Sequence, residues 1–155
     1  MPKVSHKYQI LIISISKPLL IGVYRDNILI DKISTDKKAS DVLLNIIYEI
    51  IEKYDVNKII YTSSPGSYMA IKLTYIILQT IQIIKDIPIF GCSGFSLNQG
   101  NPIKAIGNLY FIKEKETIIT KKYEQLNKSN FELPTDINNL ILNDNAKPNY
   151  LIPAV

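Results

Sequence analysis

The sequence predicts an α/β fold in which one mixed sheet carries helices. Three observations support this class: strand-like segments open the chain, two long helix-like segments follow, and a short apolar segment comes after each helix. The chain has 155 residues, of which 46% are hydrophobic, and this is enough apolar material for a core of ordinary size. We therefore expect a folded α/β body and no long disordered region.

The first three segments have the pattern of an antiparallel meander. The expected strands are residues 8–15, 19–24 and 28–33. Pro18 interrupts the first connection, and Arg25-Asp26-Asn27 is a polar turn before the third strand. The first strand is apolar on nearly every residue through Ile13, which is typical of a central strand covered on both faces.

Two helices, each followed by a short strand, come next. Ser40 is the expected N-cap of the first helix, which runs to about Tyr54. Ser67 is the expected N-cap of the second helix, which reaches Asp86. The strands after them are expected at residues 58–62 and 89–91, and a further helix at 93–98.

The resulting order, β-β-β-α-β-α-β, favours an actin-like or ribonuclease-H-like (ASKHA) domain. A hairpin-rich sheet extended by right-handed parallel crossovers allows few other layouts. Beyond residue 100, turn residues separate the shorter segments 105–113, 117–123 and 139–142. We expect residues 1–99 to form the actin-like N-terminal domain, and residues 100–155 a reduced second lobe with a C-terminal tail.

Both helices carry more apolar surface than packing on one sheet requires. An amphipathic helix needs an apolar arc of about 100°, whereas apolar residues surround most of both helices. The side of the second helix away from the sheet is expected to mix aromatic and polar residues, as protein interfaces do. The predicted partner-binding residues are Leu43, Leu44, Ile47, Tyr48, Ile51, Tyr68, Ile71, Lys72, Tyr75, Gln79 and Gln82. The alternative is that the second lobe or the C-terminal segment covers these faces.

Composition argues against several kinds of site. The net charge is +4, but acids interrupt even the lysine-rich residues 113–128, which favours a solvated surface over a nucleic-acid site. A single cysteine, Cys92, and a single histidine, His6, cannot form a disulfide framework or a tetrahedral zinc site. The apolar residues 71–84 are too few to span a bilayer, which needs about 20. We expect a cytoplasmic protein without a metal or cofactor of its own.

Four segments resemble the bacterial TsaB/YeaZ family. Residues 64–72, S-P-G-S-Y-M-A-I-K, resemble its signature G-P-G-S-F-T-G-(L/I/V)-R. Residues 10–16 resemble its first strand, I-L-A-I-D-T-(S/A), and residues 87–93 resemble I-P-(I/V/L)-x-G-(V/I)-S. Residues 147–151 are similar to the closing (E/K)-P-x-Y-(L/I)-R. The chain is identified as a shortened member of this family.

Some positions depart from the family pattern. Ser14 stands where the family usually has Asp, Ser64 and Ala70 replace glycines, and Lys72 and Ile152 replace arginines. Actin-like enzymes use an acidic residue on the first strand to position a metal. Because a hydroxyl is a weak ligand for Mg²⁺, Ser14 predicts that this route to catalysis is lost.

The resemblance implies a non-catalytic partner of TsaD, the catalytic subunit in the synthesis of threonylcarbamoyladenosine on tRNA. Members of the family pair their first two helices with the matching helices of TsaD, and the ATPase TsaE docks on this pair. ATP and Mg²⁺ are then expected only in the partner complex, and tRNA only through it. The alternatives are a homodimer through the same helices, and a small ribonuclease-H-like or sugar-kinase-like enzyme.

The loop Ser64-Pro65-Gly66-Ser67 has two interpretations. A turn followed by an N-cap explains these residues and is favoured. The backbone N–H groups at the helix start are also suited to hold an anion. A hydrolytic role for Ser67 would need a neighbouring base, and the sequence offers no Ser-His-Asp arrangement.

Overall fold

The structure, a computed structural model, describes residues 6–106, 108–115, 117–123, 131–143 and 148. The family-like tail at 147–151 lies outside these residues except for Pro148, and so do residues 124–128 of the lysine-rich segment. The elements are β1 (Tyr8–Ile13), β2 (Leu19–Arg25), β3 (Ile28–Thr35), α1 (Ala39–Lys53), β4 (Val56–Ser64), α2 (Tyr68–Lys85), β5 (Ile89–Ser93), the 3-10 turn η1 (Gly94–Ser96), β6 (Ile103–Ile106), β7 (Leu109–Glu114) and β8 (Thr117–Lys122).

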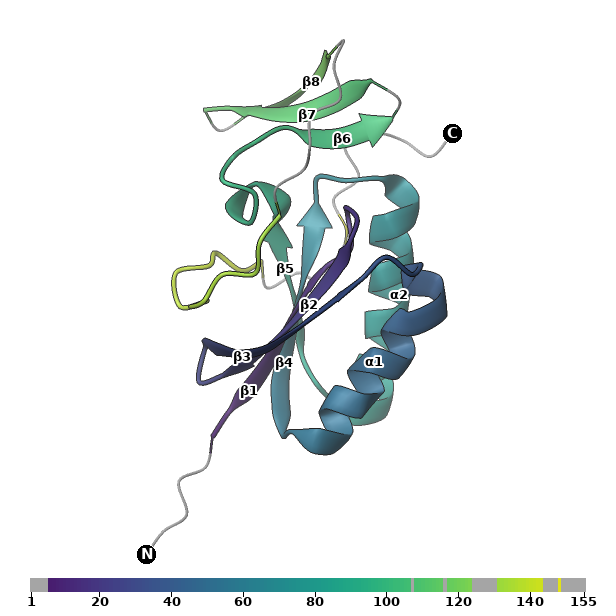
Figure 1. Cartoon of the computed structure of the whole chain (residues 1–155), viewed down its shortest axis with the longest axis vertical. Coiled ribbons are helices and arrows are strands. Elements are labelled where there is room, and N and C mark those ends of the chain that lie inside the picture. The colour runs from purple at the N-terminus through teal and green to yellow at the C-terminus, as the bar shows by residue number, and fades with distance from the viewer. Residues whose placement is uncertain (1–5, 107, 116, 124–130, 144–147, 149–155) are drawn as a thin grey trace, which may run out of the picture.

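A five-stranded mixed sheet is the centre of the molecule (Figure 1). Its strand order is β3-β2-β1-β4-β5. The first three strands pair antiparallel, and β4 and β5 continue the sheet parallel to β1. The predicted mixed α/β class is therefore confirmed.

The central strand β1 is buried on both faces, as its apolar sequence predicts. Ile10 and Ile12 belong to the core on the helix side, whereas Leu11 and Ile13 belong to the core on the opposite side. All four side chains are fully buried. A strand with two covered faces has no need of polar alternation, which explains the continuous apolar run.

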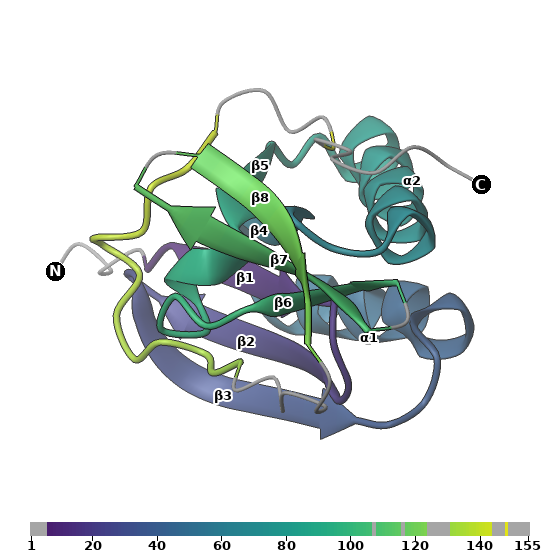
Figure 2. The same cartoon turned by 90° about the horizontal axis from the view of Figure 1, so that it is seen from above.

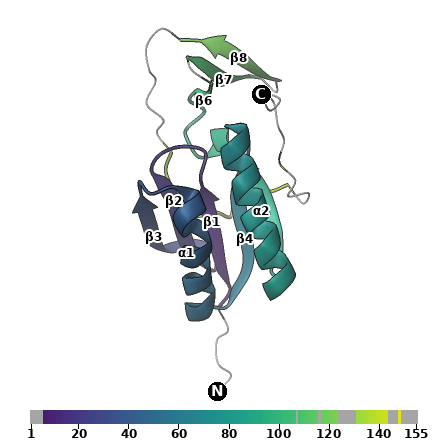
Figure 3. The ribbon, with the colours of Figure 1, turned by 90° about the vertical axis from the view of Figure 1, so that its right-hand side faces the viewer.

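The two α-helices lie next to each other on one face of the sheet (Figure 3). The ammonium group of Lys85 on α2 lies 5.7 Å from the ring centroid of Tyr48 on α1. Of the described residues in the helix-side core, none comes from beyond Ile89. No helix in the described part of the chain is both long enough and apolar enough to cross a membrane.

The two helices begin differently. The predicted cap of α2 is confirmed, because the Ala70 N–H donates to Ser67 Oγ at 3.2 Å. The predicted cap of α1 is wrong, because the helix already includes Ser40 and its N-cap is Lys38. Lys38 has the extended backbone of a cap residue, but its side chain cannot accept a hydrogen bond, and α1 has no side-chain cap.

Beyond η1, the chain adds a second sheet and an irregular segment. β6, β7 and β8 form an antiparallel sheet beyond one end of the larger sheet (Figures 1 and 2). The single segment expected at 105–113 is thus two strands. Residues 131–143 run along the larger sheet. The described residues 139–142, expected as a short segment, form no strand, and the next residue, Asn143, makes an isolated bridge to Gly91.

One hydrophobic core joins these later parts to the larger sheet. It contains Ile60 and Cys92 from the sheet, Phe111 from β7, and Phe131 and Ile137 from the irregular segment. The later parts in this core pack on the sheet face opposite the helices. They therefore do not contribute to the packing of the helix layer. The boundary at residue 99 stays a prediction.

Candidate partner-binding surface

The outward side of α2 carries a line of exposed aliphatic side chains. Its buried side consists of Ile71, Thr74, Leu78 and Ile81, all fully buried. On the opposite side, Met69, Ile76 and Ile83 are 70%, 49% and 83% exposed. These three residues are spaced by seven positions, close to two helical turns, so they align along one face. We call them the α2 stripe.

Two further exposed aliphatic residues flank the α2 stripe on the helix layer. Ile84 of α2 is 59% exposed and Leu44 of α1 is 39% exposed. Of the nine large hydrophobic side chains that are exposed among the described residues, five lie on these two helices. Scattered exposed apolar residues are ordinary, but their concentration on two neighbouring helices makes this layer the candidate interaction surface.

Three predicted partner-binding residues are core residues instead. Leu43, Ile47 and Ile71 are 0% exposed and pack in the helix-side core against the sheet. A side chain with no exposure cannot contact a partner while the fold is intact. The prediction is therefore corrected at these positions. The apolar projection had counted the sheet-facing side of each helix as part of the surplus.

The other predicted residues lie at the edges of the helix layer. Tyr48, Ile51, Tyr68 and Tyr75 are half-buried, and Leu44, Lys72, Gln79 and Gln82 are exposed. On α2, four of these residues form two hydrogen-bonded pairs. Lys72 Nζ donates to the Tyr68 hydroxyl at 3.2 Å, and Gln79 Nε2 donates to the Tyr75 hydroxyl at 2.7 Å. They occupy one flank of α2, while the middle of its outward face is aliphatic.

Sequence reasoning missed the α2 stripe. The signal was present in the seven-residue spacing of Met69, Ile76 and Ile83. The sequence of a helix that is apolar on all sides does not reveal which side packs on the sheet. In the structure the sheet lies against the opposite side of α2, so these three residues face outward.

The loop before α2 is built for packing and capping. A side chain on Gly66 would place its Cβ 2.6 Å from Ile15 Cγ2, so the close approach requires glycine. Pro65 is buried, and the Ser67 hydroxyl accepts the cap hydrogen bond of α2. Ser64 Oγ is buried and has no hydrogen-bond partner among the described residues. These contacts agree with the favoured turn-and-cap interpretation.

Ser14, where the resembled sequence pattern usually has Asp, carries a hydroxyl that bonds to α2. Ser14 Oγ lies 2.6 Å from Thr74 Oγ1, and Thr74 donates its only hydroxyl proton to the Ala70 carbonyl at 2.9 Å. Ser14 is therefore the donor to Thr74, and it ties the end of β1 to α2. Within the described ranges, no group of three or more His, Cys, Asp or Glu side chains is placed to hold a metal.

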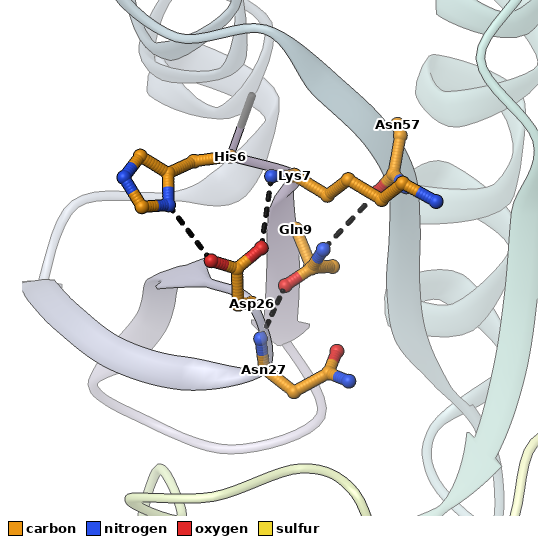
Figure 4. Close-up of polar contacts among 6 residues, drawn as sticks. All are labelled: His6, Lys7, Gln9, Asp26, Asn27 and Asn57. Atoms are coloured by element: carbon orange, nitrogen blue, oxygen red, sulfur yellow. Dashed lines mark hydrogen bonds and ion pairs between the residues drawn. The ribbon is translucent and has the colours of Figure 1, made fainter. Parts of the chain in front are cut away.

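Two remaining reactive or titratable groups serve the fold. Cys92 is 0% exposed, and burial raises the pKa of its thiol to about 12, so the thiol stays protonated in the core. At the other end of β1, the Asp26 carboxylate accepts from the Lys7 backbone N–H at 3.0 Å and lies 2.8 Å from His6 Nδ1 (Figure 4). The adjoining Gln9 accepts from the Asn27 N–H at 2.9 Å. This cluster fixes the turn between β2 and β3.

Comparison with known proteins gives a fold but no sequence family. No protein-family model matches the chain, and no curated protein matches it. Among solved structures it is similar to YeaZ from Pseudomonas aeruginosa, with a TM-score of 0.57 and 8% sequence identity over 76% of this chain and 65% of that one. A second similar structure is an uncharacterised protein from Pseudomonas aeruginosa that is described as similar to the peptidase YeaZ. Its TM-score to this chain is 0.55, with 8% identity over 77% of this chain and 65% of that one. The chain has a YeaZ-like fold, and the match spans just under two thirds of each neighbour.

Proposed function

We propose that this chain is a non-catalytic partner subunit of the TsaB/YeaZ type, which binds and supports TsaD in the threonylcarbamoyladenosine modification of tRNA. The observation that carries the proposal is the α2 stripe, Met69, Ile76 and Ile83, exposed on a YeaZ-like fold. The resemblance of residues 64–72 to the family signature supports the same conclusion independently of the surface.

The α2 stripe is suited to helix–helix packing. Side chains repeated every seven residues form a ridge that fits the groove of a second helix. Burying one exposed isoleucine or methionine side chain completely contributes about 1.5–3 kcal/mol before the costs of association. Leu44 and Ile84 widen the ridge toward α1, so that a pair of partner helices can cover the exposed residues of both α1 and α2. A four-helix interface with TsaD accounts for this surface.

The fold supports the finer assignment to the actin-like (ASKHA) class. A three-stranded meander is followed by two crossover helices on one face of the sheet. The small β6–β8 sheet then corresponds to a reduced second lobe. In this reading, the hydroxyl of Ser14 occupies the place of the metal-positioning acid, and the chemistry with ATP and Mg²⁺ belongs to the partner complex. TsaE and tRNA then meet this chain only in that complex, in the cytoplasm.

The test is complex formation with TsaD from the same organism. We expect the purified chain and TsaD to form a heterodimer in light scattering after gel filtration. Ile76→Asp and Ile83→Asp each should weaken binding by about tenfold or more, because a buried unpaired charge replaces an apolar contact. Ile141→Asp is the matched control, since Ile141 is 79% exposed but lies on the irregular segment 131–143.

Modified tRNA is the functional readout. TsaD, TsaE and the wild-type chain should together produce threonylcarbamoyladenosine, and the stripe variants should lower the yield in proportion to lost binding. Wild-type chain that neither binds TsaD nor supports the modification would refute the proposal.

A homodimer through the α2 stripe is a second candidate state. The same exposed aliphatic residues can pair with a second copy about a two-fold axis. Sedimentation of the pure chain decides it: a dimer that Ile83→Asp converts to a monomer places the stripe in the self-interface, and a wild-type monomer at all concentrations excludes this state.

A further inference from the structure

A cavity of about 410 Å³ opens beside the start of both helices. Three parts of the chain form it: the connection between β1 and β2, the residues just before and at the start of α1, and the first turns of α2. Its polar lining consists of Ser14, Ser16, Ser40, Lys17, Lys37 and Lys38. The cavity lies within the range of about 300–1,000 Å³ that is typical of small-molecule sites.

The charge around this cavity is of one sign. Three lysines line it and no carboxylate does. None of the ammonium groups of Lys17, Lys37 and Lys38 has an ion-pair or hydrogen-bond partner among the residues that the structure describes. Three unpaired cations around one hollow attract an anion.

The start of α1 also bears on the charge at this cavity: Asp41 in its first turn offsets part of the positive helix end, but Asp41 is not among the residues that line the cavity. The first-turn N–H groups of a helix need acceptors, and the helix dipole makes this end positive. Lys38 stands at the N-cap, where Ser, Thr, Asp or Asn is preferred, and no side chain caps the helix. The second helix, capped by Ser67, follows the usual rule. A sequence that breaks a local rule in this way is expected where function requires it.

The rest of the cavity wall is apolar. Leu19 is 5% exposed and Leu73 is half-buried, and the other apolar lining residues are Ala39, Ala70 and the exposed Met69. An inorganic ion would leave this wall in contact with water. A ligand with an aliphatic body would cover it.

We propose that this cavity binds a small organic anion, an aliphatic body that ends in a single carboxylate or phosphate. In this proposal the exposed lysines Lys17, Lys37 and Lys38 bind the anionic head, and the aliphatic wall, Leu19, Leu73 and Met69, contacts the body. The cavity adjoins the α2 stripe at Met69, which lines it, whereas Ile76 and Ile83 do not, and the inference does not rest on the TsaD proposal.

The test uses octanoate and octyl phosphate as probes of the two head groups on the isolated, isotope-labelled chain. In two-dimensional amide NMR we expect at least one probe to cause saturable shifts at Ala39, Ser40 and Ala70. The probe that binds more tightly identifies the head group. Octan-1-ol, which has the same body without charge, and acetate, which has the charge without the body, should each bind at least about tenfold more weakly.

Lysine variants assign the site. Lys37→Met combined with Lys38→Met should weaken octanoate or octyl phosphate binding by at least about fivefold, and Lys17→Met on the other wall should act in the same direction. Lys122→Met on β8 is the matched control and should leave binding unchanged, and the amide spectrum of each variant reports whether it is folded. The proposal is overturned if neither probe gives saturable shifts at 10 mM (about ten thousandfold above a Kd of about 1 μM), if octan-1-ol binds equally well, or if the shifts centre on Ile76 and Ile83.

Discussion

The hydroxyl of Tyr24 donates a 2.7 Å hydrogen bond to the carbonyl oxygen of Pro134 and so joins β2 to the irregular segment 131–143. Tyr24 is 0% exposed, and burial of its hydroxyl raises the pKa above the ordinary tyrosine value. The Leu29 N–H donates to the Thr135 carbonyl at 2.9 Å beside it. Together these bonds hold the segment against the sheet face opposite the helices.

Replacing Tyr24 by Phe tests this attachment. We expect Tyr24→Phe to lower the free energy of unfolding by about 1–2 kcal/mol, because the carbonyl of the half-buried Pro134 loses its donor while the ring still packs. Urea denaturation measures the change. Tyr123→Phe is the control, since the Tyr123 hydroxyl has no hydrogen-bond partner among the described residues. Equal stability of Tyr24→Phe and wild type would show that the segment does not depend on this bond.

The corrected division of α2 into a core side and an outward side is tested by alanine substitution. Ile71→Ala should lower the unfolding free energy by about 2–5 kcal/mol, because Ile71 is 0% exposed and its removal leaves a cavity. Ile83→Ala should change it by no more than about 0.5 kcal/mol, because Ile83 is 83% exposed. Denaturant unfolding of the isolated chain provides both values. A large loss for Ile83→Ala would mean that the monomer itself covers the α2 stripe.

The sequence predicted the elements better than the surface. Strands and helices through residue 93 follow from apolar periodicity and from turn and cap residues, which act locally. The outward face of α2 does not follow from the sequence, because Ile76 and Ile71 are the same residue type. Only the position of the sheet makes Ile76 a surface residue and Ile71 a core residue. The helix start at Lys38 also escaped prediction, because Ser40 is the better capping residue but lies two positions too late.

The cavity could not be predicted from any single segment. Its lining residues belong to three stretches, around Ser14, Lys38 and Met69, that are separated in the sequence and meet only through the crossover from β3 to α1 and the packing of α2. The lysines and serines come from the first two stretches. Each stretch alone is an ordinary loop or helix start. The fold brings the lysines of the first two stretches and the apolar residues of the third around one hollow.

The uncapped start of α1 predicts a conflict between stability and ligand binding. Lys38→Ser should supply the missing side-chain acceptor and remove a cation from the positive helix end. We expect the unfolding free energy to rise by about 1 kcal/mol, which corresponds to about 2–4 °C in Tm for a chain of this size. The same variant should bind octanoate or octyl phosphate less tightly. Lys37→Ser, one residue before the cap, should weaken binding of the probe without raising the Tm.

The Asp26 cluster predicts an acid-sensitive contribution to stability. The Lys7 backbone N–H, and secondly the His6 side chain, hold the pKa of Asp26 below its usual range. A carboxyl group whose pKa is lower in the folded state than the unfolded value of about 3.9 stabilises the fold above that value, and the contribution is lost as pH falls through the folded pKa. Asp26→Asn should therefore be less stable than wild type at pH 7.

The pH profile then separates the two partners of Asp26. Thermal unfolding curves of wild type and Asp26→Asn should converge as pH falls below about 4, because the wild-type carboxyl is then increasingly protonated. His6→Ala should keep most of the pH dependence, since the Lys7 N–H is the larger cause of the lowered pKa and its 3.0 Å bond remains. If His6→Ala instead abolished the difference between pH 7 and pH 3, the imidazole would be the dominant partner and the backbone bond a minor one.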